Sequence, residues 1–178
     1  MFKSLLASMV CFMMASSAMA LDFNPLVGVQ VQAEDEKIGA ESGLALGAEF
    51  ITNNKIIFGA SFSANKRDDL IGATEYIWGP AEVENSTVSL WVGKLFDNGF
   101  AAKVGYSHYA SEMTVRTLQW GSDSVSGDQS YLLIGGAYHF NNGFNINTHL
   151  NIPVSGDTYY GTELSDYVNM QLLAGYRF

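Results

Sequence analysis

The sequence has 178 residues, 48% of them hydrophobic, and its 18 acidic side chains outweigh 9 lysines and arginines to give a formal charge of −9. This acidity excludes nucleic-acid binding as the main function, because the phosphate backbone attracts basic surfaces. Eighteen glycines, eleven phenylalanines and nine tyrosines against three prolines favour an all-β fold.

The N-terminal segment is typical of a secretory signal peptide. It has a basic residue at Lys3, an apolar stretch over residues 5–14, and the small-residue cleavage site Ala-Met-Ala at 18–20. The apolar stretch is too short to cross a bilayer comfortably. We therefore expect residues 1–20 to be removed, which leaves residues 21–178 as one domain.

Three short turns recur along the chain at a spacing of 44 residues. "FDNGF" occupies 96–100, "FNNGF" occupies 140–144, and the related "ITNNKI" occupies 51–56. Asn-Gly and other Asn-rich pairs supply the positive φ angles of tight hairpin turns. Alternating apolar residues flank each turn, so each is predicted to be the tip of a hairpin.

Three turns on one side imply eight strands if both chain ends also lie on that side. The expected strands are 24–32, 43–51, 56–64, 85–96, 100–109, 131–140, 144–154 and 167–178. Long loops are expected at about 33–42, 65–84, 110–130 and 155–166. Strands of this length, with short turns at one end and long loops at the other, indicate an eight-stranded antiparallel up-and-down transmembrane β-barrel. A soluble barrel of the lipocalin type has a similar length and is the alternative.

The polar face of the strands decides between these two barrels. In strand 144–154 the apolar row is opposed by Asn145, Asn147, His149 and Asn151. A soluble surface carries roughly a quarter to a third charged residues, whereas this face is mostly Asn, Gln, Ser and Gly. The pattern therefore predicts a polar interior and an apolar, lipid-facing exterior. In strand 85–96, Lys94 falls on the lipid face and Trp91 on the interior face, which indicates either a snorkelling lysine or a bulge.

Phenylalanines gather at the turns and at the last residue, where they are expected to form an aromatic girdle at one membrane interface. The girdle comprises Phe50, Phe96, Phe100, Phe140, Phe144 and Phe178.

With its signal peptide, its Asn-rich turns and its closing "GYRF", the chain resembles the small eight-stranded outer-membrane barrels of the OmpX/Ail and OmpA-transmembrane type. The resemblance implies that the C-terminal alternation is the signal read by the barrel-insertion machinery. The residues of this barrel-assembly signal are Phe178, Tyr176, Ala174, Leu172 and Met170. The same scaffold carries adhesins, stability factors and enzymes, so it does not fix a function.

Three charged residues are predicted to face the interior near the turn side: Glu49, Lys103 and Arg177. An isolated buried charge is costly, so we expect them to form an ion network that plugs the lumen. A narrow gated pore is the alternative. The side chains of an eight-stranded barrel fill its lumen, so a general porin is not expected.

The loops hold most of the charge and a few aromatic residues. The loop charges are mainly acidic, which disfavours an anionic polysaccharide as ligand. Exposed aromatic side chains are frequent at binding surfaces, and the possible loop contacts are Tyr76, Trp78, Tyr159 and Tyr160.

A lipid A deacylase is the enzymatic alternative. Some outer-membrane lipid A deacylases carry a His-x-Ser pair on a lipid-facing strand. In this chain Ala110 stands where that serine would follow His108, and Ser111 falls on the opposite face. No catalytic residue, metal site or cofactor is therefore predicted. His139 and His149 are interpreted as hydrogen-bonding interior residues.

We expect a monomeric outer-membrane protein of a Gram-negative bacterium, with periplasmic termini and extracellular acidic loops. The expected function is non-enzymatic, in envelope integrity, adhesion or surface interaction. The expected partners are outer-membrane lipid or lipopolysaccharide, the barrel-insertion machinery and an unidentified surface ligand.

Overall fold

The computed structural model describes residues 21–32, 41–70, 80–117, 121–156, 158–159, 162–163 and 168–178. Its barrel strands are β1 (Asp22–Gln32), β2 (Glu41–Ile51), β3 (Ile56–Leu70), β4 (Pro80–Leu95), β5 (Phe100–Thr117), β6 (Gly121–His139), β7 (Phe144–Gly156) and β10 (Asn169–Tyr176). A separate two-stranded sheet is formed by β8 (Thr158–Tyr159) and β9 (Thr162–Glu163).

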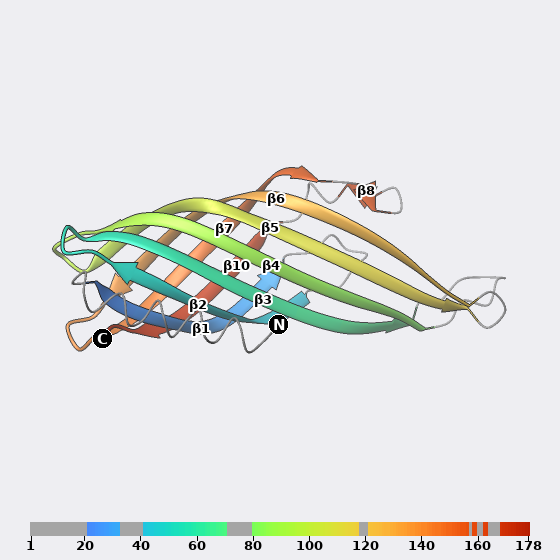
Figure 1. The fold of residues 1–178 in the computed structure, drawn as a ribbon, viewed down its shortest axis with the longest axis horizontal. Helices are drawn as coiled ribbons and strands as arrows, with labels where there is room; N and C mark the ends of the chain where they lie inside the picture. Colours follow the sequence, from blue (N-terminus) through green and yellow to red (C-terminus); the bar gives the residue numbers. More distant parts are fainter. Residues whose placement is uncertain are drawn as a thin grey trace.

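The eight longer strands form one closed antiparallel barrel in the order β1-β10-β7-β6-β5-β4-β3-β2 (Figure 1). The last strand closes the barrel against the first, with Leu26 opposite Gly175 and Val31 opposite Met170. The amide of Phe178 continues this seam by donating to the carbonyl oxygen of Phe23 at 2.9 Å. The predicted eight-stranded up-and-down barrel is thus confirmed. In the part of the chain that the structure describes, no helix has the length and apolar character needed to cross a membrane.

The three predicted turns lie together at one end of the barrel, called here the turn end. Gly99 and Gly143 adopt φ angles of 83° and 89°, and the equivalent position of the first turn is Lys55 with φ of 61°. The turns close through amide-to-carbonyl bonds from Gly99 to Phe96 and from Gly143 to Phe140, both at 3.1 Å. The positive φ explains why glycine recurs at this position of the repeat.

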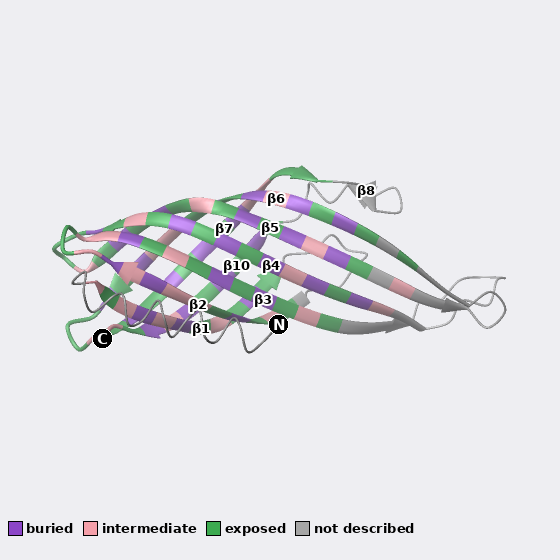
Figure 2. Cartoon of the chain, in the orientation of Figure 1, coloured by how far each residue is buried: buried purple, intermediate pink, exposed green. Residues whose placement is uncertain are grey.

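Buried and exposed residues alternate along the strands, as the banding of Figure 2 shows. In β7 the residues at 145, 147, 149 and 151 are buried, and those between them are exposed. Exposed large hydrophobic residues line the outside of every barrel strand, and most buried polar residues are uncharged. The barrel therefore has the predicted polar interior and apolar exterior. Trp91 is buried and Lys94 is exposed within a regular register, so β4 contains no bulge at this point.

Phenylalanines lie around the turn end as predicted. Phe96, Phe100, Phe140, Phe144 and Phe178 are exposed. Phe50 is partly buried and packs against Phe23, with ring centroids 5.3 Å apart.

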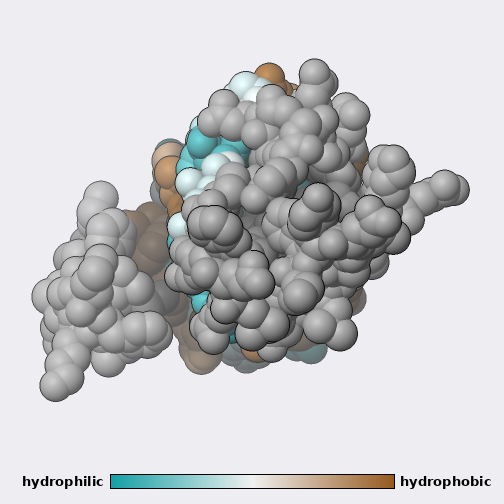
Figure 3. Space-filling model, turned by 90° about the vertical axis from the view of Figure 1, so that its right-hand side faces the viewer, coloured by the Kyte–Doolittle hydropathy of each residue, from teal (hydrophilic) through white to brown (hydrophobic). Residues whose placement is uncertain are grey.

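Four neighbouring strands are longer than predicted. β3 and β5 continue past 64 and 109 to Leu70 and Thr117, while β4 and β6 begin at Pro80 and Gly121. Much of the expected loops at 65–84 and 110–130 is therefore strand, and β3–β6 extend to the right beyond the rest of the barrel in Figure 1. We call the part of these strands that starts at the row Ala64, Ser86, Ala110 and Asp128 and runs away from the turn end the protruding sheet. Seen from this end, the coloured surface is hydrophilic in front, with hydrophobic atoms on the flank behind (Figure 3).

The error has a physical cause. Glycine, serine and charged residues are typical of loops, so the sequence alone predicts loops at 65–84 and 110–130. Beyond a membrane, however, both faces of a sheet can meet water, so polar residues on both faces are compatible with a strand. The apolar alternation marks only the part of each strand that lies against lipid.

Candidate functional site

Near the turn end, the lumen is occupied by a buried ion pair between Glu49 of β2 and Lys103 of β5. Both side chains are fully buried. The Glu49 carboxylate also accepts hydrogen bonds from the indole Nε1 of Trp91 at 2.8 Å and from the Nδ2 of Asn24 at 2.9 Å. The Lys103 ammonium lies 5.7 Å from the centroid of the Trp91 ring and donates to Oδ1 of Asn147.

Asparagine side chains complete a ring around this pair. Asn147 donates to Asn145 at 2.7 Å, and Asn145 donates to Asn24 at 2.7 Å. Because Asn24 binds Glu49 and Asn147 binds Lys103, the ring links strands β1, β2, β5 and β7. The carboxylate therefore has two neutral hydrogen-bond partners, Asn24 and Trp91, and the ammonium has one, Asn147. Such additional hydrogen bonds are what a buried ion pair requires.

A second layer of polar residues crosses the lumen farther from the turn end. Gln30 of β1 donates to the hydroxyl of Thr87 on β4 at 2.8 Å and accepts from Gln171 of β10 at 2.7 Å. Gln171 in turn accepts from Ser61 at 3.1 Å. These bonds join strands on different sides of the barrel, so side chains bridge the lumen at two levels.

Arg177 does not join the predicted lumen network. Its Nε lies 3.7 Å from Oδ2 of Asp22, and both side chains are partly exposed. Arg177 follows the end of β10, at the mouth of the turn end, where water reaches the guanidinium. The structure therefore brings together Glu49 and Lys103 alone of the three charged residues. Trp91 and Asn24, which sequence reasoning did not assign to the network, take the remaining places around the carboxylate.

The five residues of the predicted assembly signal share the outward face of the C-terminal segment. Met170, Leu172, Tyr176 and Phe178 are exposed and Ala174 is partly exposed. Phe178 is the most exposed, at 75%, and its ring packs edge-on against Tyr176 with centroids 5.1 Å apart. This apolar row is thus accessible along the seam with β1.

The predicted aromatic loop contacts fall mostly outside the described residues. Tyr76, Trp78 and Tyr160 lie there, and Tyr159 is described only as part of the short strand β8, paired with Thr162.

The histidines differ from one another in their surroundings. His108 is exposed on the outward face and Ser111 is buried on the opposite face, as the alternation predicts. The register instead places Ser130 of β6 opposite His108, but the Ser130 hydroxyl lies 2.6 Å from the Tyr106 hydroxyl. This cross-strand neighbour was missed because pairing between strands cannot be read from local spacing.

Of the two interior histidines, only one makes the expected hydrogen bond. His149 packs on Trp91 with centroids 4.4 Å apart, and its Nδ1 lies 3.4 Å from Oε1 of Gln171. His139 is buried, but neither ring nitrogen has a hydrogen-bond partner among the described residues. The interpretation of His139 as a hydrogen-bonding residue was wrong. The described residues also contain no cluster of three or more His, Cys, Asp or Glu side chains that could hold a metal ion.

Comparison with solved structures identifies the architecture. The attachment invasion locus protein Ail of Yersinia pestis, solved with the heparin analogue sucrose octasulfate, matches 89% of this chain and 99% of its own, with a TM-score of 0.68 and 13% identity. A second Ail structure matches 88% and 98% of the two chains, with a TM-score of 0.59 and 16% identity. The chain has the fold of the small eight-stranded outer-membrane barrels.

A major outer membrane protein from Thermus thermophilus also matches, over 89% of this chain and 100% of its own, with a TM-score of 0.60 and 15% identity. No protein-family model matches the sequence, and no curated protein matches it. Identities this low show the common fold and leave the function to the residues of this chain.

Proposed function

We propose that this protein is a non-enzymatic, monomeric outer-membrane barrel of a Gram-negative bacterium that binds a surface partner through its protruding sheet. The observation that carries the proposal is the continuation of β3–β6 beyond the barrel. A protein that only filled the membrane would not need these extra residues, because about 9–11 residues suffice for a strand to cross it.

The orientation follows from the two unlike ends. Outer-membrane barrels have short periplasmic turns and longer extracellular segments, so the turn end is assigned to the periplasm and the protruding sheet to the outside. The expected signal peptide at residues 1–20 supports export. The exposed phenylalanines at the turn end fit the inner interface, where aromatic side chains gather.

The lumen supports a non-conducting role. The Glu49–Lys103 pair and the asparagine ring link four strands near the turn end, and the Gln30 layer bridges the lumen again. Ion conduction would require these bonds to break together. A narrow pore would appear as conductance in planar bilayers that disappears when Glu49 is replaced.

The protruding sheet offers a strand edge for binding. Among the described residues, β6 pairs with β7 only from Gln129 onward, so the segment 121–128 has a strand partner on the β5 side alone. This segment contains no Lys or Pro, which are common blocks to edge pairing, and its only charged residues are Asp123 and Asp128. An extended segment of a partner protein can add to such an edge through main-chain hydrogen bonds.

The partner is not an anionic polysaccharide. Ail was solved with a sulfated heparin analogue. The segment 121–128 carries Asp123 and Asp128, and β5 places one basic residue, Arg116, and one acidic residue, Glu112, opposite it, so the acidic residues prevail. Sulfate groups would meet like charge there. A neutral or basic peptide segment fits this edge better.

A shortened barrel tests the proposal. Replacing residues 66–84 and 112–126 by two-residue Asn-Gly turns joins Asn65 to Asn85 and Ser111 to Gly127, which already pair across the strands. A deletion strain is complemented with the full or shortened chain and assayed for adherence to protein-coated surfaces and for detergent sensitivity. Heat-dependent gel mobility checks that both barrels fold.

We expect the full chain to restore adherence and the shortened chain to fail, with equal detergent resistance. Equal adherence of both would overturn the proposal. Loss of detergent resistance alone would assign the protein to envelope integrity. For the enzymatic alternative, mass spectrometry of lipid A from overproducing cells would show a new species that disappears with His108→Ala.

A further inference from the structure

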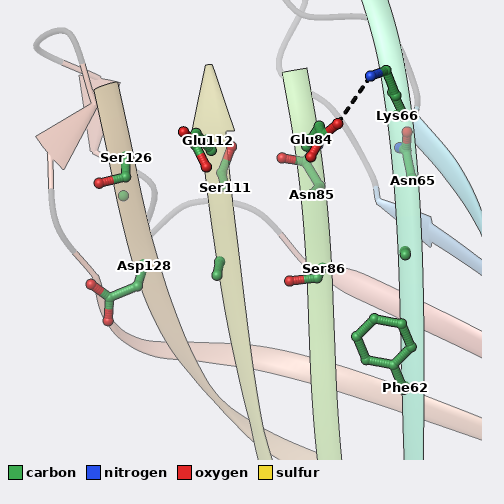
Figure 4. A pocket seen from close by; sticks show the side chains of 13 residues that line it. Phe62, Asn65, Lys66, Glu84, Asn85, Ser86, Ser111, Glu112, Ser126 and Asp128 are labelled. Carbon is green, nitrogen blue, oxygen red and sulfur yellow. Dashed lines mark hydrogen bonds and ion pairs between the residues drawn. The ribbon is translucent and has the colours of Figure 1, made fainter. Parts of the chain in front are cut away.

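The outward face of the protruding sheet contains a hollow of about 780 Å³, shown in Figure 4. Its floor is a row of short side chains that the register places side by side: Ala64 of β3, Ser86 of β4 and Ala110 of β5, with Asp128 of β6 at the end. The volume lies within the roughly 300–1,000 Å³ typical of small-ligand sites.

The two rows beside this floor differ in chemistry. On the side toward the turn end, the row begins with the exposed apolar residues Phe62 and Val88 and continues with His108 and Ser130. Leu90 extends the apolar surface farther toward the turn end. On the other side, Lys66, Glu84 and Glu112 form a charged row. The hollow therefore lies where the apolar belt gives way to polar surface, which is the level of lipid headgroups in a membrane.

Of the four charged side chains that line the hollow, three are carboxylates, which accept hydrogen bonds: Glu84, Glu112 and Asp128. The Lys66 ammonium is already bound to Glu82 and, at 3.0 Å, to Glu84. Glu112 and Asp128 then remain on the far side of the hollow from Lys66 (Figure 4). A phosphate headgroup would meet an excess of carboxylates and be repelled. Hydroxyl groups, in contrast, donate hydrogen bonds to carboxylates and form strong, charge-assisted bonds.

From this arrangement we propose that the hollow binds the sugar headgroup of an outer-leaflet glycolipid. The acyl chains lie along Phe62, Val88 and Leu90, and the sugar hydroxyls donate to Glu112 and Asp128. The inference rests on the membrane orientation proposed above, but it requires no surface partner.

The test uses the full mature chain in nanodiscs. The bilayer is phosphatidylcholine doped with equal amounts of glucosyl diacylglycerol and phosphatidylglycerol of identical acyl chains, and native mass spectrometry counts the lipids retained. We expect the glycolipid to be retained at least about tenfold more than phosphatidylglycerol, a difference of about 1.4 kcal/mol. Equal retention, or a preference for phosphatidylglycerol, would overturn the proposal.

A substitution that fills the hollow, compared with the same substitution outside it, tests the site. Ala110→Phe places a ring on the floor and should abolish the preference, whereas Ala102→Phe, at an exposed position of the same strand, should keep it. If Ala110→Phe does not fold, Asp128→Ala takes its place and should reduce the preference severalfold; an unchanged preference contradicts the site. Displacement by excess methyl glucoside, which has no acyl chains, would assign the hollow to free saccharide and overturn the lipid assignment.

Adherence and lipid retention give independent results. The nanodisc measurement does not involve a surface partner, so failure of the adherence assay leaves it intact. Loss of glycolipid preference likewise leaves the proposed edge-binding function of β6 standing.

Discussion

The indole of Trp91 lies against Gly59 in the space where any other residue would carry its Cβ. A Cβ on Gly59 would lie 2.2 Å from Cε2 and 2.3 Å from Nε1 of the indole. The two residues are cross-strand partners on β3 and β4. Because Nε1 of Trp91 donates to Glu49, this glycine indirectly positions the lumen ion pair.

Gly59→Ala is expected to lower the free energy of unfolding by about 1–3 kcal/mol, the usual cost of overpacking. The methyl group would displace the indole and lengthen its bond to Glu49. Urea titration in detergent, followed by tryptophan fluorescence, measures the change. Gly136→Ala is the control, because its nearest atoms lie 3.7 Å from the new methyl group. Equal effects of both variants would contradict this role of Gly59.

Glu49→Gln is expected to lower the free energy of unfolding by about 3–5 kcal/mol, because it leaves the Lys103 ammonium buried without a counter-ion. The double variant Glu49→Gln with Lys103→Met removes both charges and should recover most of that loss. The same urea titration yields the coupling energy. The single variant Lys103→Met completes the comparison. If the losses of unfolding free energy in the two single variants add up to the loss in the double variant, the two charges do not depend on each other.

Phe178→Ser is expected to reduce assembly in cells without large loss of stability. The ring is 75% exposed, and the seam bond at this position comes from the backbone amide. Assembly is measured as the fraction of heat-modifiable protein in the outer membrane, and stability by refolding purified protein in detergent. Val154→Ser, at another exposed apolar position, is the control. An equal assembly defect in the control would remove the special role of the last residue.

The Lys66 ammonium should titrate above its ordinary value. Its hydrogen bond to Glu82, and then that to Glu84, raise the pKa from 10.5. A raised pKa means that the stabilisation from these bonds is complete below pH 10.5 and is lost as the pH rises through the folded-state value. NMR titration of the Nζ signal checks this, and the double variant Glu82→Gln with Glu84→Gln should return the pKa toward 10.5.

Sequence reasoning reached the barrel because its main signal is local. Turn residues and two-residue alternation depend only on neighbours along the chain, and they placed Phe178 in a closing strand and Trp91 in the interior. The strand ends were less accessible, since Glu84 and Glu112 look the same in a loop and in a sheet that meets water on its outer face.

The lumen network could be inferred only in part. The two-residue alternation shows that Glu49 and Lys103 face inward, but their partners come from strands distant in sequence. Asn24 and Asn145 meet because the barrel closes, and no local pattern reports that. The alternation also predicts an inward-facing Arg177. Because Arg177 lies at the mouth of the turn end, its partner is Asp22 instead.

The seam between β1 and β10 makes the barrel mechanically unequal around its circumference. As described, β10 has eight residues, whereas β6, separated from it by β7 alone, has nineteen. Backbone hydrogen bonds hold the wall together, so the wall is weakest where its strand is shortest. Heating or pulling should therefore open the cylinder along this line first, and the chain end that completes the barrel is also where it begins to come apart.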